Sequence, residues 1–348
     1  MNRILQISMC LVLVGSFAAF AQDERFRARI TGLENDTITC VALRHDSSLT
    51  TLGYNSGGVS IHNPIGAKFI GVSMWNGHAR PVTGTAFAPD GKLFATSSLD
   101  GTVKVWETAT AYAYQKTKEM NPKANTMIPQ PKWVLNASPG GVHGVQFSPD
   151  GKTVVAACGD GNVRIFGMAK GNLTQTISAA HKGPVLSVGF SSDGKRVVSG
   201  GQDKSAKVWK LELKGKNPLV LPKHPGPVTT VAFSPDDARI ATGSGVAMKS
   251  GIVRIWESES GKEEFVLDKF DDMVMSVAFH PKESARLAVG SRDLKLRVWD
   301  LEKKEIGYTD DHAKEVLSVA FSADGKLLGS ASPDTAKWWD GTPPLKQQ

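Results

Sequence analysis

Cysteine is scarce in this sequence, with three residues among 348. One of them, Cys10, lies in an apolar N-terminal stretch, so the rest of the chain contains only Cys40 and Cys158. These two residues are far apart in the sequence and form neither a CxxC pair nor a CxxCH haem-attachment motif. A disulfide scaffold and a cysteine-based metal or haem site are therefore not expected, and we predict no bound cofactor or metal.

The sequence also lacks runs of charge of one sign. Lys and Arg number 41 against 34 Asp and Glu, which gives a net charge of +7, but the basic residues are scattered singly along the chain. Proteins that bind nucleic acids gather basic residues into a patch or stripe, often with aromatic side chains that stack on bases. No such series is present, so we do not expect a nucleic-acid partner.

A single long apolar stretch covers residues 4–21. It follows Arg3 and ends in Ala19-Phe20-Ala21. A positive start, an apolar core and a small-x-small ending are the features of a signal peptide. We therefore predict a signal peptide over residues 1–21 and export to the periplasm or the extracellular space. The alternative is an uncleaved N-terminus that anchors a structural protein of the cell envelope in a membrane.

The rest of the chain is built from a unit that recurs about every 43 residues. Each copy has an apolar start, the pattern VxxxxF, a turn related to Pro-Asp-Gly, a second strand, a turn with Asp, and a third strand that ends in Trp. Alternation of apolar and small residues predicts short strands, and sequences such as SPDGK predict hairpin turns with a positive-φ glycine. The seven copies begin near residues 38, 82, 142, 185, 228, 274 and 316.

Four copies carry the motif most clearly, as FAPDGK…LDGTVKVWE, FSSDGK…QDKSAKVWK, FSPDD…GIVRIWE and FSADGK…PDTAKWWD. In this pattern the chain resembles the WD40 repeat family over nearly its whole length after residue 21. The resemblance implies an all-β fold, a seven-bladed β-propeller with four-stranded blades around a central channel. We assign residues 22–340 to this single domain and residues 341–348 to a C-terminal tail, and expect an exported, bacterial-type monomer.

The two ends of the repeat array complement each other. Residues 26–31 form an alternating segment before the first copy, whereas the last copy stops after its third strand. We predict that the strand over residues 26–31 completes the last blade and closes the ring.

The resemblance also implies a polar network in the blades. In the family, a His before the inner strand bonds a hydroxyl on the second strand and an Asp in the next turn, and the hydroxyl bonds the Trp of the third strand. Three complete sets match: His78, Thr96, Asp100 and Trp106; His181, Ser199, Asp203 and Trp209; and His312, Ser330, Asp334 and Trp339. A His between a hydroxyl and a carboxylate also describes a hydrolase triad, but a catalytic site is needed once and a blade network once per blade. We interpret these residues as structural, and expect the blades that begin near 38, 142 and 274, which lack parts of the set, to depend on packing alone.

An enzyme of this fold would place ionisable residues on the inner strands, facing the channel. The small-residue positions of those strands contain no carboxylate, and His143 with Gln146 is the only polar pair expected to face the channel. We therefore predict no enzymatic activity. The alternative is a propeller enzyme or metal-dependent hydrolase that uses the channel around these two residues.

The resemblance instead favours a non-catalytic scaffold for protein–protein interaction, because loops on one face of such propellers commonly bind proteins or peptides. The loops concerned lead into the inner strands or join the second and third strands, and here they are mildly basic, which predicts an acidic partner. The candidate contact residues are Arg80, Lys182, Lys204, Met248, Lys249, Arg292, Lys295 and Lys314. A polar insertion over residues 107–130 is predicted to be a solvated loop on the opposite face, with a recognition arm as the alternative.

Overall fold

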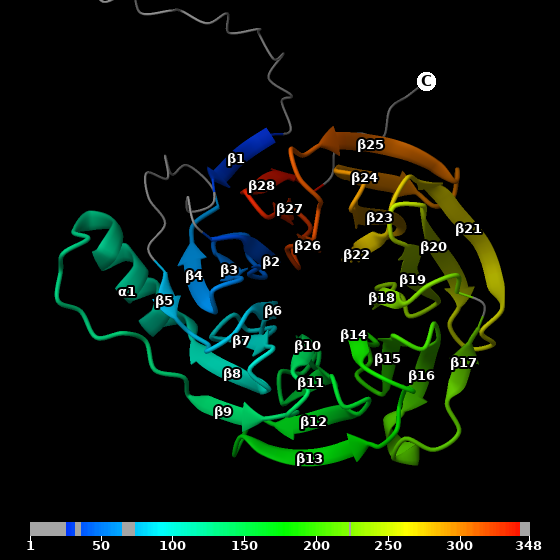
Figure 1. The fold of residues 1–348 in the computed structure, drawn as a ribbon, viewed down its shortest axis with the longest axis horizontal. Coiled ribbons are helices and arrows are strands. Elements are labelled where there is room, and N and C mark those ends of the chain that lie inside the picture. The colour runs from blue at the N-terminus through cyan, green and yellow to red at the C-terminus, as the bar shows by residue number, and fades with distance from the viewer. Residues whose placement is uncertain (1–25, 32–35, 65–73, 223, 342–348) are drawn as a thin grey trace, which may run out of the picture.

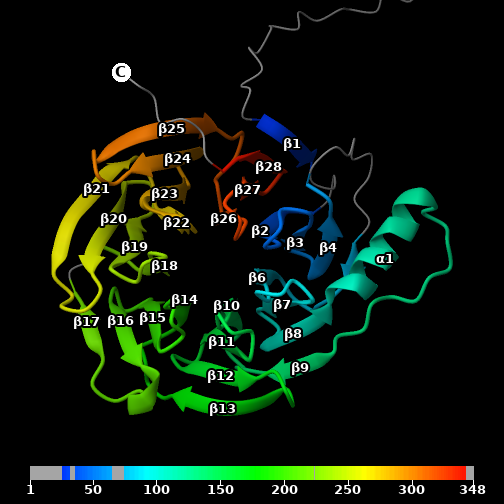
Figure 2. The same cartoon turned by 180° about the vertical axis from the view of Figure 1, so that it is seen from behind.

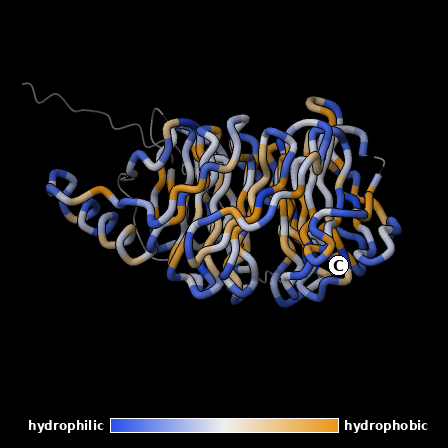
Figure 3. Tube along the Cα trace, turned by 90° about the horizontal axis from the view of Figure 1, so that it is seen from below, coloured by the Kyte–Doolittle hydropathy of each residue, from blue (hydrophilic) through white to orange (hydrophobic). Residues whose placement is uncertain are grey.

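Seven four-stranded antiparallel sheets stand around a central axis in the computed structural model of the chain (Figure 1). Seen from behind or from the edge, the sheets form the blades of a flat disc (Figures 2 and 3). The predicted all-β, seven-bladed propeller is thereby confirmed. The structure describes residues 26–31, 36–64, 74–222 and 224–341. The predicted signal peptide and residues 342–348 of the tail lie outside these ranges. Within them, no helix has the length and hydropathy needed to span a membrane.

Each blade has an inner strand, two middle strands and an outer strand. The inner strands are β2 (Ile38–Leu43), β6 (Val82–Phe87), β10 (Val142–Phe147), β14 (Val185–Phe190), β18 (Val228–Phe233), β22 (Val274–His280) and β26 (Ser318–Phe321). The second strands are β3 (Thr50–Tyr54), β7 (Leu93–Ser98), β11 (Thr153–Cys158), β15 (Arg196–Gly201), β19 (Arg239–Val246), β23 (Glu283–Ser291) and β27 (Leu327–Ser332). The third strands are β4 (Gly58–His62), β8 (Thr102–Glu107), β12 (Val163–Gly167), β16 (Ala206–Lys210), β20 (Ser250–Glu257), β24 (Lys295–Asp300) and β28 (Thr335–Asp340). The outer strands are β5 (Trp75–Asn76), β9 (Trp133–Asn136), β13 (Asn172–Ile177), β17 (Leu219–Leu221), β21 (Glu263–Phe270), β25 (Glu305–Asp311) and β1 (Phe26–Thr31). We number the blades 1 to 7 in the order of their inner strands.

Turn chemistry explains why the first two strands of each blade form a hairpin. In the SPDGK turn of blade 3, the Ser148 hydroxyl donates to Asp150 Oδ1 at 2.6 Å, and the same oxygen accepts the Lys152 N–H at 3.0 Å. Gly151 has φ of +69°, a left-handed conformation that glycine adopts without steric cost. The turn residues thus set the strand register that places one face of the blade against its neighbour.

The apolar core is divided among the junctions between blades. Seven buried clusters are present in the described residues, and each contains side chains from two adjacent blades. Between blades 1 and 2, Trp106 packs edge-on against Trp75 with ring centroids 5.7 Å apart, and stacks with Phe94 at 6.3 Å. Because each blade contributes to two clusters, burial stabilises the disc as a ring.

The chain ends meet in blade 7. Strand β1 pairs antiparallel with β28, with Ile30 opposite Ala336 and Thr31 opposite Thr335, and it is the outer strand of the last blade (Figure 1). Ile30 is fully buried in the cluster between blades 7 and 1, beside Ile38 and Trp338. The first segment of the propeller therefore both covers the edge of β28 and fills the junction to blade 1.

The prediction of a solvated loop over residues 107–130 is wrong for its first half. Helix α1 (Thr108–Met120) follows β8 directly and lies outside the ring against β4 of blade 1 (Figure 2). Its buried positions are Thr108, Ala111 and Gln115, which recur at the three-to-four residue spacing of a helix. Since two of the three are polar, the apolar periodicity that usually signals an amphipathic helix is missing.

The helix compensates for a short outer strand. In blade 1, β5 pairs with only Gly58 and Val59 of β4, so the outer edge of the second half of β4, which pairs with β3 on its inner side, has no strand partner among the described residues. Glu119 of α1 contacts the buried His62 at the end of β4, with 3.3 Å between Oε1 and Nδ1. A helix inserted between the third and outer strands of blade 2 thus covers blade 1 in space.

We expect deletion of residues 26–31 to lower the melting temperature by several degrees or more, because it exposes the edge of β28 and removes buried Ile30. Ile30→Ala alone leaves a cavity and is expected to cost about 2–5 kcal/mol in the free energy of unfolding. Met127→Ala, at a side chain that is 89% exposed, is the control and should change neither the melting temperature nor the free energy of unfolding. An unchanged melting temperature after the deletion would show that the ring does not depend on β1.

Channel, blade networks and candidate interaction face

Blades 2 and 4 contain the predicted polar network with all of its contacts. His78 Nδ1 lies 2.8 Å from Asp100 and Nε2 lies 2.7 Å from the Thr96 hydroxyl, which accepts the Trp106 indole N–H at 2.9 Å. The corresponding distances in blade 4 are 2.9, 2.8 and 2.8 Å, for His181 with Asp203, His181 with Ser199, and Trp209 with Ser199. Both hydroxyl-bearing residues are fully buried, so no substrate reaches a hydroxyl that could act as a nucleophile.

Blades 7 and 5 contain variants of this network. In blade 7, His312 bonds Ser330 at 3.0 Å, but its Nδ1 lies 3.2 Å from the Ser332 hydroxyl, which in turn donates to Asp334 at 2.9 Å. The predicted direct contact between His312 and Asp334 is therefore replaced by a contact through Ser332. Blade 5 has a network that the three predicted sets did not include, in which His224 and Trp256 both bond the Thr242 hydroxyl at 2.8 Å.

The expectation that the remaining blades depend on packing alone is wrong. Asp160 in blade 3 pairs with Arg164 at 2.6 Å, and Asp293 in blade 6 pairs with Arg297 at 2.8 Å. In blade 1, His62 Nε2 lies 2.8 Å from the Ser60 hydroxyl. Each of these blades therefore has polar contacts of its own in place of the His–Asp pair.

The sequence contains a signal for the two Asp–Arg pairs. The arginine stands four residues after the aspartate, as in DGNVR and DLKLR, whereas blades 2 and 4 have lysine there, as in DGTVK and DKSAK. The lysines donate instead to the carbonyl that precedes the histidine, from Lys104 to Gly77 and from Lys207 to Ala180, each at 2.6 Å. In the two blades where no histidine faces the aspartate, arginine is its partner, because the planar guanidinium binds a carboxylate through two N–H groups.

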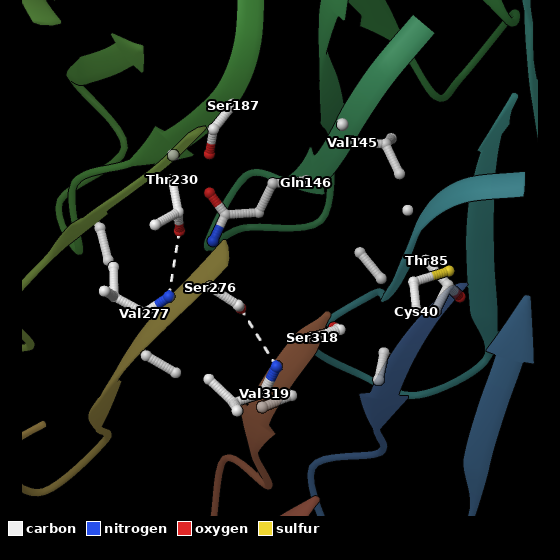
Figure 4. Close-up of a pocket in the computed structure, with 18 of the residues that line it drawn as sticks. Cys40, Thr85, Val145, Gln146, Ser187, Thr230, Ser276, Val277, Ser318 and Val319 are labelled. Carbon is white, nitrogen blue, oxygen red and sulfur yellow. Dashed lines mark hydrogen bonds between the residues drawn. The ribbon is translucent and has the colours of Figure 1, made fainter. Parts of the chain in front are cut away.

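The central channel is enclosed by inner-strand residues of all seven blades and has a volume of about 570 Å³ (Figure 4). Its lining contains no Asp, Glu, Lys or Arg among the described residues, and the titratable side chains in it are Cys40 and His143. Burial raises the pKa of Cys40 to about 12 and lowers the pKa of His143. No group of three or more His, Cys, Asp or Glu side chains in the described chain is placed to hold a metal ion.

Hydrogen bonds between adjacent inner strands cross every one of the seven junctions. In four of them a hydroxyl accepts a backbone N–H of the next blade, from Val231 to Ser187, Val277 to Thr230, Val319 to Ser276 and Val41 to Ser318. Figure 4 shows the bonds of Val277 and Val319. Two others use Thr39 and Thr83, which donate to the carbonyls of Val82 and Val142 at 2.6 Å. In the last, the Phe190 N–H donates to Gln146 Oε1 at 2.6 Å. Gln146, which we expected to face the channel together with His143, lies in the channel lining and also joins blades 3 and 4.

Cations with a carboxylate partner and cations without one lie on both faces of the disc. We define the upper face by the loops that lead into the inner strands and the turns between second and third strands; the lower face is opposite. On the lower face, Lys92, Lys152 and Lys326 each lie 3.7–3.9 Å from the aspartate two residues earlier, whereas Lys195 and Lys262, for example, have no salt bridge in the described chain. Upper-face cations without a carboxylate at salt-bridge distance in the described chain are Lys182, Lys204, Lys249, Arg292, Lys295 and Lys314.

All eight candidate contact residues belong to upper-face loops or strand ends. Seven are exposed, and Lys295, the first residue of β24, is half-buried. Arg80 differs from the other cations because its guanidinium donates to the Leu99 carbonyl at 3.1 Å. The carboxylates of this face that belong to blade networks, such as Asp100 and Asp203, are already hydrogen-bonded, whereas Asp271 and Glu315 in the loops leading into inner strands are in no salt bridge in the described chain.

Comparison of the sequence with family models matches the description "WD domain, G-beta repeat" at residues 70–107, 129–167, 171–210, 215–257, 261–300 and 303–340. The chain belongs to the WD40 repeat family. The six matched segments do not include residues 36–64 of the first blade, whose WD40 pattern is weakened by Leu43 at the phenylalanine position and His62 at the tryptophan position.

Curated WD40 relatives match parts of the chain. A periodic tryptophan protein 2 homolog of Dictyostelium discoideum is 25% identical over 72% of this chain and 20% of its own length. Subunit I of eukaryotic translation initiation factor 3 of Candida albicans is 34% identical over 23% of each chain, and human WD repeat and SOCS box-containing protein 1 is 33% identical over 26% of this chain and 22% of its own. The chain thus spans less than a quarter of each relative. All three are eukaryotic, so the expected bacterial type is not borne out. The WD40 repeats and these relatives support an interaction scaffold in general terms.

Acid is expected to destabilise this propeller through its buried histidines. Burial, assisted by nearby Arg254, lowers the pKa of His224 to about 4; burial, assisted by Lys337, lowers the pKa of His312 to about 3. Below pH 6.5 the unfolded chain binds protons at these histidines that the folded chain does not bind, so stability falls as pH falls towards 4. We expect roughly 3 kcal/mol from His224 alone when urea unfolding is compared at pH 7 and pH 4. His224→Gln should reduce the slope, and equal stability at both pH values would contradict the interpretation.

The two Asp–Arg pairs should differ in their contribution to stability. In blade 6 the side chains of Arg297 and Asp293 are 6% and 3% exposed, so Arg297→Met leaves a buried charge without its partner and is expected to cost about 3–5 kcal/mol. In blade 3 the side chains of Arg164 and Asp160 are 18% and 25% exposed, so Arg164→Met is expected to cost about 1 kcal/mol or less. Urea unfolding of both variants measures the difference in the free energy of unfolding. An equal loss of stability in Arg297→Met and Arg164→Met would contradict this prediction.

Proposed function

We propose that the protein is a non-catalytic scaffold that binds an acidic protein or peptide through the upper face. The exposed cations of the upper-face loops carry this proposal. Lys182, Lys204 and Lys314 have no carboxylate at salt-bridge distance in the described chain, so they would attract opposite charge on a partner. The hydrogen bonds between inner strands and the blade networks hold the upper-face loops on a rigid support. Such loops bind by complementarity of surface and charge, with no chemical step.

The channel supports an enzymatic alternative less well. Acid–base or metal chemistry would need several ionisable groups that converge on one point, and the lining offers His143 and the buried thiol of Cys40. The other polar side chains of the inner strands are already engaged across the blade junctions, as the contacts of Thr83, Ser276 and Gln146 show. We therefore propose that this chain is not an enzyme.

Reversal of charge on one face at a time tests the proposal. Lys182, Lys204, Lys295 and Lys314 are replaced together by Glu on the upper face; the matched control replaces Lys92, Lys152, Lys195 and Lys326, which end lower-face turns, by Glu. Both variants change the net charge by the same amount. In affinity capture from the exported or envelope fraction of the source cells, we expect the upper-face variant to lose a near-stoichiometric partner that the control retains.

Salt dependence tests the electrostatic part separately. Binding of the captured partner should weaken as ionic strength rises, because salt screens exposed charges over about 10 Å at 0.1 M. Equal loss in both variants would place the contact elsewhere, and an affinity independent of salt would remove the acidic character from the proposal.

We further propose that residues 1–21 direct export of the protein. The positive start, the apolar core and the small-x-small ending of that segment support this proposal. Mass spectrometry of the protein isolated from its source should find Gln22 as the first residue. A chain that begins at Met1 in a membrane fraction would instead favour an uncleaved anchor.

A further inference from the structure

Large apolar side chains are rare on the upper face. Of the exposed large hydrophobic residues in the described chain, only Val246, Met248 and Leu294 belong to upper-face turns, and they are 36%, 85% and 42% exposed. Val246 and Met248 belong to the turn between β19 and β20 in blade 5, and Leu294 to the equivalent turn of blade 6, the next blade in the ring. The apolar part of this face is therefore confined to two adjacent blades.

The blade 5 turn is a hairpin whose tip is held in place. Strands β19 and β20 continue past the usual turn position, with Gly245 opposite Gly251 and Val246 opposite Ser250. The Lys249 N–H donates to the Val246 carbonyl at 3.1 Å, and Met248 has φ of +56°, which a non-glycine residue adopts only where its surroundings hold it. The methionine thus projects from a closed turn.

A single loop connects this tip to the turn of blade 6. The Met248 N–H donates to Asp272 Oδ1 at 2.9 Å, and the N–H of the adjacent Asp271 donates to Asp293 Oδ2 at 3.2 Å, one residue before Leu294. Leu294 also has a positive φ of 71°. The two apolar tips are therefore fixed relative to one another through Asp271 and Asp272.

Charges of both signs lie around these tips. The loop that joins them contributes Asp271 and Asp272, of which Asp272 Oδ1 already accepts the N–H groups of Met248 and Met273. Lys249 and Arg292 flank the tips in the two turns, and Lys314 is exposed in the loop that leads into the neighbouring blade 7; none of these three cations is in a salt bridge within the described chain. Blade 5 also lacks the carboxylate that Asp100 and Asp203 supply in blades 2 and 4. His224 Nδ1, which would face it, is buried without a hydrogen-bond partner among the described residues.

We propose that Val246, Met248, Lys249, Arg292 and Leu294, which we call the blade 5–6 surface, are the centre of the binding face. The partner is a protein segment with one large apolar side chain flanked by Asp or Glu. The apolar side chain is buried between Met248 and Leu294, where rigid tips lose little entropy on binding, and the carboxylates lie against Lys249 and Arg292. This inference rests on the proposed scaffold function and specifies its partner.

Selection from a random peptide library displayed on phage tests the inference with the purified full chain as target. Enriched peptides should contain a large apolar residue with acidic neighbours. For a synthetic peptide from the selection, we expect Met248→Ser with Leu294→Ser to weaken binding at least about tenfold, since one apolar side chain withdrawn from water is worth that much or more. Lys249→Glu with Arg292→Glu should weaken it by a similar factor.

Matched controls separate this inference from the general scaffold function. Met120→Ser with Met127→Ser changes two methionines that are 77% and 89% exposed on the insertion between β8 and β9 of blade 2, and it should leave binding unchanged. Circular dichroism and the melting temperature show that each variant is folded. Peptides that depend on Lys182 and Lys204 but not on Met248 would overturn the blade 5–6 surface and leave the upper-face scaffold intact. Enrichment of peptides without acidic residues, or no enrichment, would overturn both the partner chemistry and the site.

Discussion

The hydrogen bonds that join each inner strand to the next are the contacts on which the ring depends. Apolar burial between blades supplies most of the stabilisation, but it is not directional and would tolerate a slide of one blade along its neighbour. A side chain such as Ser276 that accepts the N–H of Val319 fixes the offset between two strands. At least one hydrogen bond from a side chain of one inner strand to the backbone of the next is present at each junction. The positions of the loops on both faces follow from that offset.

Because the inner-strand hydrogen bonds hold the ring, the polar network within each blade can vary without loss of the fold. A carboxylate in the turn between the second and third strands is partly buried, so it needs a partner with complementary charge or hydrogen bonds. Blades 2 and 4 supply histidine, and blades 3 and 6 supply Arg164 and Arg297. Blade 5 has the histidine without the carboxylate, and there the turn has become the longer hairpin that presents Met248.

These networks also shape the surface that a partner would contact. Carboxylates such as Asp203 and Asp293 are occupied within their own blades, so the neighbouring lysines and Arg292 remain free to meet charge on a partner. In some lower-face turns Asp and Lys pair within the same hairpin, as Asp90 does with Lys92. The contacts that stabilise the blades thus also determine which charges the upper face presents.

The amino-acid sequence by itself determined the all-β class, the seven blades and the His78 and His181 networks, because each depends on residues at fixed spacing within one repeat. Only the tertiary structure decided what lies between repeats. Helix α1 covers blade 1 although it is inserted between two strands of blade 2, and its buried Gln115 gives no apolar period to detect. Gln146 reaches the N–H of Phe190 in the next blade, and Met248 is held by Asp272 across a junction. Such contacts depend on the offset between neighbouring blades, which no pattern within a single repeat encodes.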